Sequence, residues 1–225
     1  MMKKMSLVIV ALLFTITGCS GIKFSQLSPD AMDFHPKTIA VLPATVGEHE
    51  SARDTIDTVV SRKLAESGWY DNVVDAVTIK NQIATSEELS GNIQSYIQKL
   101  NTMGVSDPAI SSRLKDFLNS DALLLTYVTS WGYGRSEGNK IARVGLGLKL
   151  IDASKGTIIW KANHEQVEEY WAVKPSLEKM AEKLMTVLMK EMPQLRTLPI
   201  LVMLRLALVA QWKIMNPYFS LKASP

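Results

Sequence analysis

The pattern of apolar and polar positions predicts a strand–helix–strand unit near residue 40. A short, mainly apolar run over 38–42 is closed by Pro43, which is typical of a strand buried on both faces. Over 51–67 apolar residues recur at helical spacing, and Gly68 then favours the end of a helix. A second short strand is predicted over 69–75. This spacing predicts parallel pairing with a right-handed crossover.

The middle of the chain, 76–120, is predicted to be mainly helical. Apolar residues at helical spacing fall into three groups: Ile79 and Ile83; Ile93, Ile97 and Leu100; and Ile110, Leu114, Phe117 and Leu118. The polar stretch 85–92 is interpreted as a loop between the first two groups. Asp107-Pro108 marks the start of the third helix.

The clearest β pattern lies between residues 121 and 167. Strands are predicted over 122–133, 141–151 and 157–162, with a glycine-containing turn region after the first and a hairpin loop at 152–156. The second strand alternates cleanly, with Ala142, Val144, Leu146, Leu148 and Leu150 on one face and Arg143, Gly145, Gly147 and Lys149 on the other. A last amphipathic helix over 174–192 is closed by Pro193.

These elements predict an α/β (α+β) domain over 37–193. Its mixed sheet begins with the β–α–β unit and ends in an antiparallel three-stranded meander, and the helices are expected to pack mainly on one face. Residues 20–36 show little apolar periodicity, so 19–36 is interpreted as a tether that precedes the domain.

The N-terminus predicts export and lipid attachment. Lys3 and Lys4 precede an apolar run over 5–14, which is too short to span a bilayer and is typical of a secretory signal peptide, here 1–18. The segment Ile16–Cys19 (Ile-Thr-Gly-Cys) resembles the bacterial lipobox, in which the cysteine thiol takes up a diacylglyceryl group. The alternative is an ordinary signal peptide followed by a buried cysteine. Cys19 is the only cysteine, so it cannot form an internal disulfide.

Charge and motif content narrow the possible functions. The formal charge of +3 falls to +1 when Lys3 and Lys4 are removed, which leaves no electrostatic case for nucleic-acid binding. The sequence contains no HExxH, P-loop or CxxC motif. The three histidines lie on different predicted elements, so no metal site is predicted. We expect no cofactor and no enzymatic activity.

Aromatic residues gather along the last strands, at Trp131, Tyr133, Trp160, Tyr170 and Trp171. Packing within the domain is the ordinary explanation, and an exposed surface for a partner or ligand is the alternative. Trp131 and Tyr133 are the candidates for such a surface. Gly132 and Gly134 around Tyr133 are interpreted as a flexible hairpin tip rather than a phosphate loop.

Gly145 and Gly147 are the other candidates for that surface. They lie on the polar face of their strand, where a missing side chain leaves a flat place for another surface to approach.

The tail 194–225 differs abruptly from the domain. Its apolar stretch 198–210 is interrupted by Pro199 and Arg205 and is short for a bilayer span. It is interpreted as an amphipathic helix on the membrane, as a helix that packs on a partner, or as the product of a frame divergence near Leu195.

Four segments carry a family resemblance: Lys37–Pro43, Leu64–Tyr70, Ser120–Leu124 and Leu150–Trp160. They resemble a family of outer-membrane lipoproteins of unknown function typified by meningococcal surface lipoproteins. They are also similar to the periplasmic domain of curli-secretion lipoproteins and to the amino-terminal domain of TolB-type proteins. The resemblance covers about 36–165, whereas the insert at 86–106 and the tail after Pro193 depart from it. It implies an α/β periplasmic domain and brings no catalytic residues.

Together these features favour a membrane-anchored, non-catalytic accessory or assembly component of an envelope transport or secretion system. Its expected partners are the membrane, through acylated Cys19, and an envelope protein or further copies of the chain. The alternative is a periplasmic module that binds a small ligand or cell-wall fragment with Trp131 and Tyr133. Ser20 after the cysteine favours the inner leaflet of an outer membrane, facing the periplasm.

Overall fold

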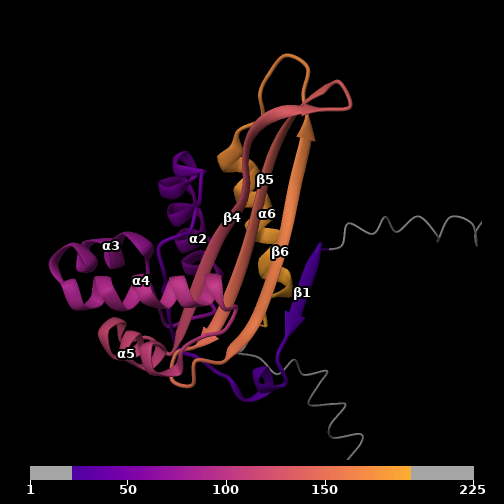
Figure 1. Cartoon of the computed structure of the whole chain (residues 1–225). Helices are drawn as coiled ribbons and strands as arrows, with labels where there is room; N and C mark the ends of the chain where they lie inside the picture. Colours follow the sequence, from indigo (N-terminus) through magenta and orange to yellow (C-terminus); the bar gives the residue numbers. More distant parts are fainter. Residues whose placement is uncertain (1–21, 194–225) are drawn as a thin grey trace, which may run out of the picture.

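The computed structural model describes residues 22–193, which form a mixed sheet flanked by helices (Figure 1). The strands are β1 (Phe24–Leu27), β2 (Thr38–Val41), β3 (Asn72–Val74), β4 (Ala122–Ser136), β5 (Asn139–Asp152) and β6 (Ile158–Glu169). The helices are η1 (Pro29–Asp33), η2 (Glu50–Ala52), α2 (Arg53–Ser67), α3 (Ala76–Thr85), α4 (Glu87–Thr102), α5 (Pro108–Leu118) and α6 (Leu177–Glu191). The six strands lie in the order β1-β6-β5-β4-β2-β3. The predicted fold class is confirmed.

The predicted strand–helix–strand unit is β2–α2–β3. β2 pairs in parallel with β3 and, on its other side, with β4. Helix α2 ends at Gly68, whose φ of 64° is a left-handed conformation that glycine adopts without strain. The unit therefore places β2 inside the sheet, where both of its faces are buried.

β4, β5 and β6 form the predicted antiparallel meander. The five apolar residues of β5 that alternate from Ala142 to Leu150 are all fully buried, as their spacing predicts. The hairpin between β4 and β5 turns at Glu137 and Gly138, which have φ values of 51° and 87°. Two consecutive positive φ angles are typical of the tight turn that matches the twist of paired strands. Gly132 and Gly134 lie within β4 itself, which corrects their interpretation as a hairpin tip.

The helices cover both faces of the sheet, not mainly one. Ile39 and Val41 of β2 belong to a core shared with α2 and α6, whereas Ala40 and Leu42 belong to a second core shared with α3, α4 and α5. The reason is the uninterrupted apolar run of β2, which needs cover on each side. Figure 1 shows that β4, β5 and β6 rise well above α3, α4 and α5, so the second core lies at one end of the sheet.

The segment interpreted as a tether contains structure. Residues Phe24–Leu27 form β1, which pairs antiparallel with β6 at the edge of the sheet. Ser25 Oγ accepts a hydrogen bond of 3.1 Å from the indole N–H of the buried Trp160. After β1, the buried Ala31 and Phe34 join the first core. The folded domain thus begins well before residue 37.

The polar stretch 85–92, interpreted as a loop, contains the last residue of α3 and the start of α4. Ser86 ends α3 and begins α4, and its Oγ accepts a hydrogen bond of 3.2 Å from the N–H of Leu89. Its polar residues lie on the solvent side of the helix, and Leu89 is buried. Among the helices within 22–193, none is long and apolar enough to cross a bilayer.

Candidate functional site

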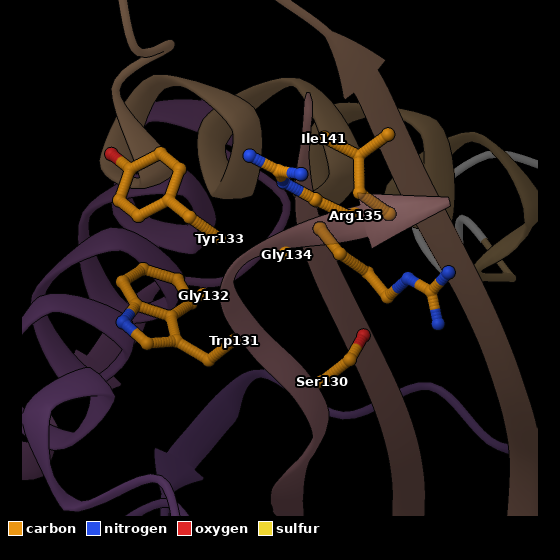
Figure 2. Close-up of a pocket in the computed structure, with 8 residues that line it drawn as sticks. Ser130, Trp131, Gly132, Tyr133, Gly134, Arg135 and Ile141 are labelled. Carbon is orange, nitrogen blue, oxygen red and sulfur yellow. The ribbon is translucent and has the colours of Figure 1, made fainter. Parts of the chain in front are cut away.

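The candidate surface lies at the distal end of the β4–β5 hairpin, away from α3, α4 and α5 (Figure 1). A shallow pocket of about 260 Å³ is located here. It is lined by Ser130, Trp131, Gly132, Tyr133, Gly134, Arg135, Ile141 and Arg143. In Figure 2 Trp131 and Tyr133 project to the same side of β4, and Ser130 lies away from them. The structure therefore brings the two predicted aromatic residues together.

A β-bulge decides which side chains face which way on this hairpin. The pairing of β4 with β5 shifts between Val128 and Ser130, so that Thr129 is an additional residue. Beyond the bulge, Trp131 lies opposite Val144 and Tyr133 lies opposite Ala142, both of which belong to the first core. A bulge changes which face of the sheet the following side chains occupy. As a result both aromatic rings lie on the same face as α6.

The side chain of Tyr133 contacts the loop that joins β6 to α6 at three residues. Its hydroxyl donates a 2.7 Å hydrogen bond to the carbonyl of Pro175, and its ring meets that of Tyr170 edge-on at 5.9 Å between centroids. The ammonium of Lys174 lies 4.7 Å from the same ring, within the range of a cation–π contact. Trp131 packs against the first core. Both aromatic residues thus have a structural role, and Tyr133 remains 42% exposed.

Gly145 and Gly147 do not form a flat, open surface. A Cβ at Gly147 would lie 1.9 Å from Cζ of Tyr127, and one at Gly145 would lie 2.2 Å from Oγ1 of Thr129. The space that side chains at Gly145 and Gly147 would occupy is therefore filled by side chains of β4. Residues opposite each other in an antiparallel pair approach closely enough for this. The interpretation of these glycines as a docking place for another molecule is corrected.

A polar network occupies the other face of the hairpin. Ser130 Oγ donates a 2.8 Å hydrogen bond to Oε1 of Glu165, and Arg143 Nε lies 3.8 Å from the same oxygen. Arg143 has 45% of its side chain exposed and Glu165 has 29%. Glu165 is therefore held by Ser130 with Arg143 close by, and both charged groups stay accessible, as polar groups are at the rim of a protein interface.

The remaining aromatic residues divide between the core and the surface. Trp160 is 1% exposed and packs in the first core, whereas Trp171 is 93% exposed and Val173 is 83% exposed. The sequence placed Trp171 in the aromatic series but did not single it out. Trp171 lies after the end of β6, outside the alternation of buried and exposed residues in the strand, and this position is the sequence feature that could have indicated its exposure.

The histidines remain apart in the structure. His164 lies on β6, and its Nδ1 accepts a 3.2 Å hydrogen bond from the N–H of Lys23. His35 and His49 lie in the loops before β2 and η2. Within residues 22–193, no group of three or more His, Cys, Asp or Glu side chains is arranged to hold a metal ion.

A larger cleft lies at the carboxyl end of β2. It encloses about 710 Å³ between the segment 43–50 and α4. Val46 and Ile97 supply apolar walls, and Arg53 and Glu50 supply charge. The Arg53 guanidinium donates to the carbonyl of Ala44 at 3.0 Å and to Glu50 at 2.8 Å, and the hydrogen bond to Glu50 raises the pKa of Arg53. The Arg53 guanidinium is therefore already paired within the domain.

Comparison with known proteins finds distant likeness in structure only. No family model matches the chain, and no curated protein matches it. Among solved structures, the PelC dodecamer from Paraburkholderia phytofirmans is 16% identical and superposes with a TM-score of 0.43, covering 69% of this chain and 87% of that one. Lipoprotein GNA1162 from Neisseria meningitidis is 18% identical with a TM-score of 0.44, covering 68% of this chain and 96% of that one.

A third solved structure, the hypothetical protein CT253 from Chlamydia trachomatis, is 12% identical with a TM-score of 0.46, covering 68% of this chain and 95% of that one. One of the three is a meningococcal lipoprotein, the kind of protein that the sequence resembles. At this identity and superposition, the likeness assigns neither a family nor a function to the chain.

Proposed function

We propose that this chain is an envelope lipoprotein that is cleaved before Cys19, acylated on that residue, and held on a membrane as a non-catalytic accessory or assembly subunit of a transport or secretion system. The observation that carries the proposal is the position of the lipobox-like segment Ile16–Cys19 relative to the fold. Strand β1 begins at Phe24, only five residues after Cys19. The attachment point therefore borders the folded domain directly.

This short connection restricts where the domain can be. Five residues span at most ~17 Å when fully extended. The membrane that receives the acyl chains must then pass within that distance of the start of β1, plus the reach of the lipid. Two or more acyl chains make such anchoring stable, whereas one gives only marginal binding. The domain is held close to the bilayer and is not presented on a long stalk.

The distal hairpin is the surface that we assign to a protein partner. Glu165 is held by the hydrogen bond from Ser130, Arg143 lies 3.8 Å from the same carboxylate oxygen, and both remain accessible beside the pocket. Preorganised charged groups of this kind favour specific orientation of a partner. We propose an envelope protein or further copies of this chain as that partner. Ser20 after the cysteine supports the inner leaflet of an outer membrane as the location.

Membrane fractionation tests the anchoring. The wild-type chain is expected in the membrane fraction and resistant to extraction with high salt, and Cys19→Ala is expected to lose that resistance. Cross-linking in the membrane followed by solubilisation tests the docking role. Wild type is expected to recover a defined complex that Arg143→Glu weakens, because this change reverses the charge beside Glu165. A wild-type chain that is recovered only as a monomer contradicts the docking role.

The cleft beside β2 favours a second candidate function, the binding of a small ligand. A volume of about 710 Å³ with apolar walls and charged groups is in the range of small-molecule sites. Thermal-shift measurements with cell-wall fragments and envelope metabolites test this candidate. A stabilising compound whose effect is removed by Ile97→Glu supports it, and the absence of any shift contradicts it.

A further inference from the structure

We infer that the loop between β6 and α6, residues 170–176, is a second membrane contact, at which Trp171 and Val173 enter the headgroup region of the bilayer that holds the acyl chains. The inference rests on the proposed acylation of Cys19 and adds the orientation of the domain on the membrane. The partner of this loop is a lipid surface.

Exposure is the first observation. Trp171 is 93% exposed and Val173 is 83% exposed, the two highest values among the large apolar residues that the structure describes. They stand two positions apart in one short loop. Tryptophan is favoured at the boundary between water and lipid because its ring combines apolar area with a polar N–H. A fixed, protruding Trp–Val pair fits that boundary better than bulk water.

Both ends of the loop are attached to the hairpin by hydrogen bonds. The attachment keeps Trp171 and Val173 pointing outward instead of folding back onto the domain. Tyr170 donates its backbone N–H to the carbonyl of Lys140 at 3.0 Å, and Tyr133 donates to the carbonyl of Pro175 at 2.7 Å. The rings of Tyr133 and Tyr170 meet edge-on at the base of the loop. The ammonium of Lys174, next to Val173, lies over the Tyr133 ring. Such a lysine can also reach lipid phosphates.

The position of the anchor is the second, independent observation. Phe24 lies opposite Asn163, and the N-terminal end of β1 points along β6 toward Glu169, because the two strands are antiparallel. From Asn163 to Glu169, β6 rises by ~20 Å. The five Cα-to-Cα steps from Phe24 back to Cys19 can extend ~17 Å in the same direction. The acyl chains and the loop can therefore reach the same bilayer.

The opposite end of the sheet is less accessible from the anchor. In the other direction β6 begins at Ile158, five residues and ~17 Å from Asn163, and Lys155 lies in the turn before it; the chain would have to reverse at Phe24 to reach this end. That end also exposes apolar side chains, since Met103 is 69% exposed and Val105 is 59% exposed. It is therefore the competing membrane surface, and it defines the control positions.

Site-specific fluorescence on the full acylated chain tests the inference. Cys19 is the only cysteine, so a single introduced thiol can be labelled when Cys19 is acylated. Val173→Cys, Lys155→Cys and Met103→Cys are each labelled with the environment-sensitive dye NBD in vesicles of three parts phosphatidylethanolamine to one part phosphatidylglycerol. We expect a blue shift, several-fold brighter emission and quenching by brominated lipids at position 173, and a water-like spectrum at 155 and 103.

Intrinsic fluorescence gives a second measurement that needs no label. Brominated lipids are expected to quench tryptophan emission of the wild-type chain, and Trp171→Phe is expected to reduce that quenching. A water-like NBD spectrum at 173, or stronger quenching at 103 than at 173, overturns the inference. Intact mass separates the two possible failures. A chain without acyl groups contradicts the proposed function, whereas an acylated chain whose loop stays in water contradicts this inference alone.

Discussion

The ring of Tyr127 fills the place of the side chain that Gly147 lacks: a Cβ at Gly147 would lie 1.9 Å from Cζ of Tyr127. The two residues are directly opposite in the pairing of β4 with β5. The ammonium of Lys149, two positions along β5, lies 5.8 Å from the centroid of the same ring. This glycine is therefore part of the packing between two strands.

Gly147→Ala is expected to lower the free energy of unfolding by about 2 kcal/mol, because the added methyl group must displace an aromatic ring from a filled space. Urea denaturation followed by circular dichroism measures the change. The matched control is the pair Tyr127→Ala and Tyr127→Ala/Gly147→Ala. With the ring removed, the alanine at 147 should cost much less than in the wild-type background. Equal costs in both backgrounds would show that Tyr127 is not the obstacle.

Asp57 of α2 is a second buried feature that can be tested. Its side chain is 1% exposed, its Oδ1 accepts a 2.7 Å hydrogen bond from the N–H of Ala44, and its Oδ2 lies 2.7 Å from the ammonium of Lys80. Lys80→Ala is expected to cost about 3 kcal/mol, because it leaves a buried carboxylate without its counter-charge. Lys63→Ala is the control, since its partner Glu66 is 52% exposed, and it should cost less than ~1 kcal/mol. Similar losses in the two variants would contradict this account.

The carboxylate of Asp121 joins the starts of β2 and β4 and predicts a dependence on pH. Burial acts to raise the pKa of Asp121, but hydrogen bonds from the N–H groups of Lys37 and Thr38 and from the Thr38 hydroxyl outweigh it, and the pKa lies below its ordinary value. A lowered pKa means that the carboxylate stabilises the fold above its unfolded pKa, ~4, and that this contribution is lost as pH falls through the folded pKa.

Asp121→Asn tests the direction of this pH dependence. The wild type should be the more stable of the two at pH 7, and the difference in free energy of unfolding should shrink as pH falls below about 4. Urea titrations at several pH values measure the difference. A difference in free energy of unfolding that stays constant down to pH 3 would mean that the charge of Asp121 does not stabilise the fold.

Ser86 joins two helices and predicts the cost of losing a cap. Its Oγ accepts the N–H of Leu89 at the start of α4. Ser86→Ala is expected to lower the free energy of unfolding by about 1 kcal/mol. Ser95→Ala, on an exposed position inside the same helix, should be neutral or slightly stabilising. If both variants behave alike in urea denaturation, the cap has no role.

Much of the sheet could be predicted because burial leaves a periodic signature. The alternation from Ala142 to Leu150 was readable because one face of β5 is fully buried and the other is not. β1 has no such signature, since all four of its residues are exposed and its place is determined by the edge of β6. The start of α4 was missed because its polar residues face water and only Leu89 marks the buried side.

The candidate site was predictable only in part. The sequence identified Trp131 and Tyr133 as candidates for an exposed surface, but the bulge at Thr129, which places them beside α6, has no sequence signal of its own. Gly145 and Gly147 predicted a flat place for another surface to approach, and the interpretation of that surface as another molecule was wrong. Spacing alone cannot tell whether that surface is a partner or the adjacent strand, and here it is Tyr127, Thr129 and Ser130 of β4. The tail 194–225, with its three interpretations, lies outside the residues that the structure describes.

Intact mass spectrometry of the mature protein, purified from membranes, tests the central claim most directly. The account predicts an N-terminus at Cys19, with residues 1–18 absent and with the added mass of a diacylglyceryl group on that cysteine. Cys19→Ala should lack the lipid mass. An unmodified Cys19 in the wild-type protein, or a mature chain that begins after it, would contradict the account.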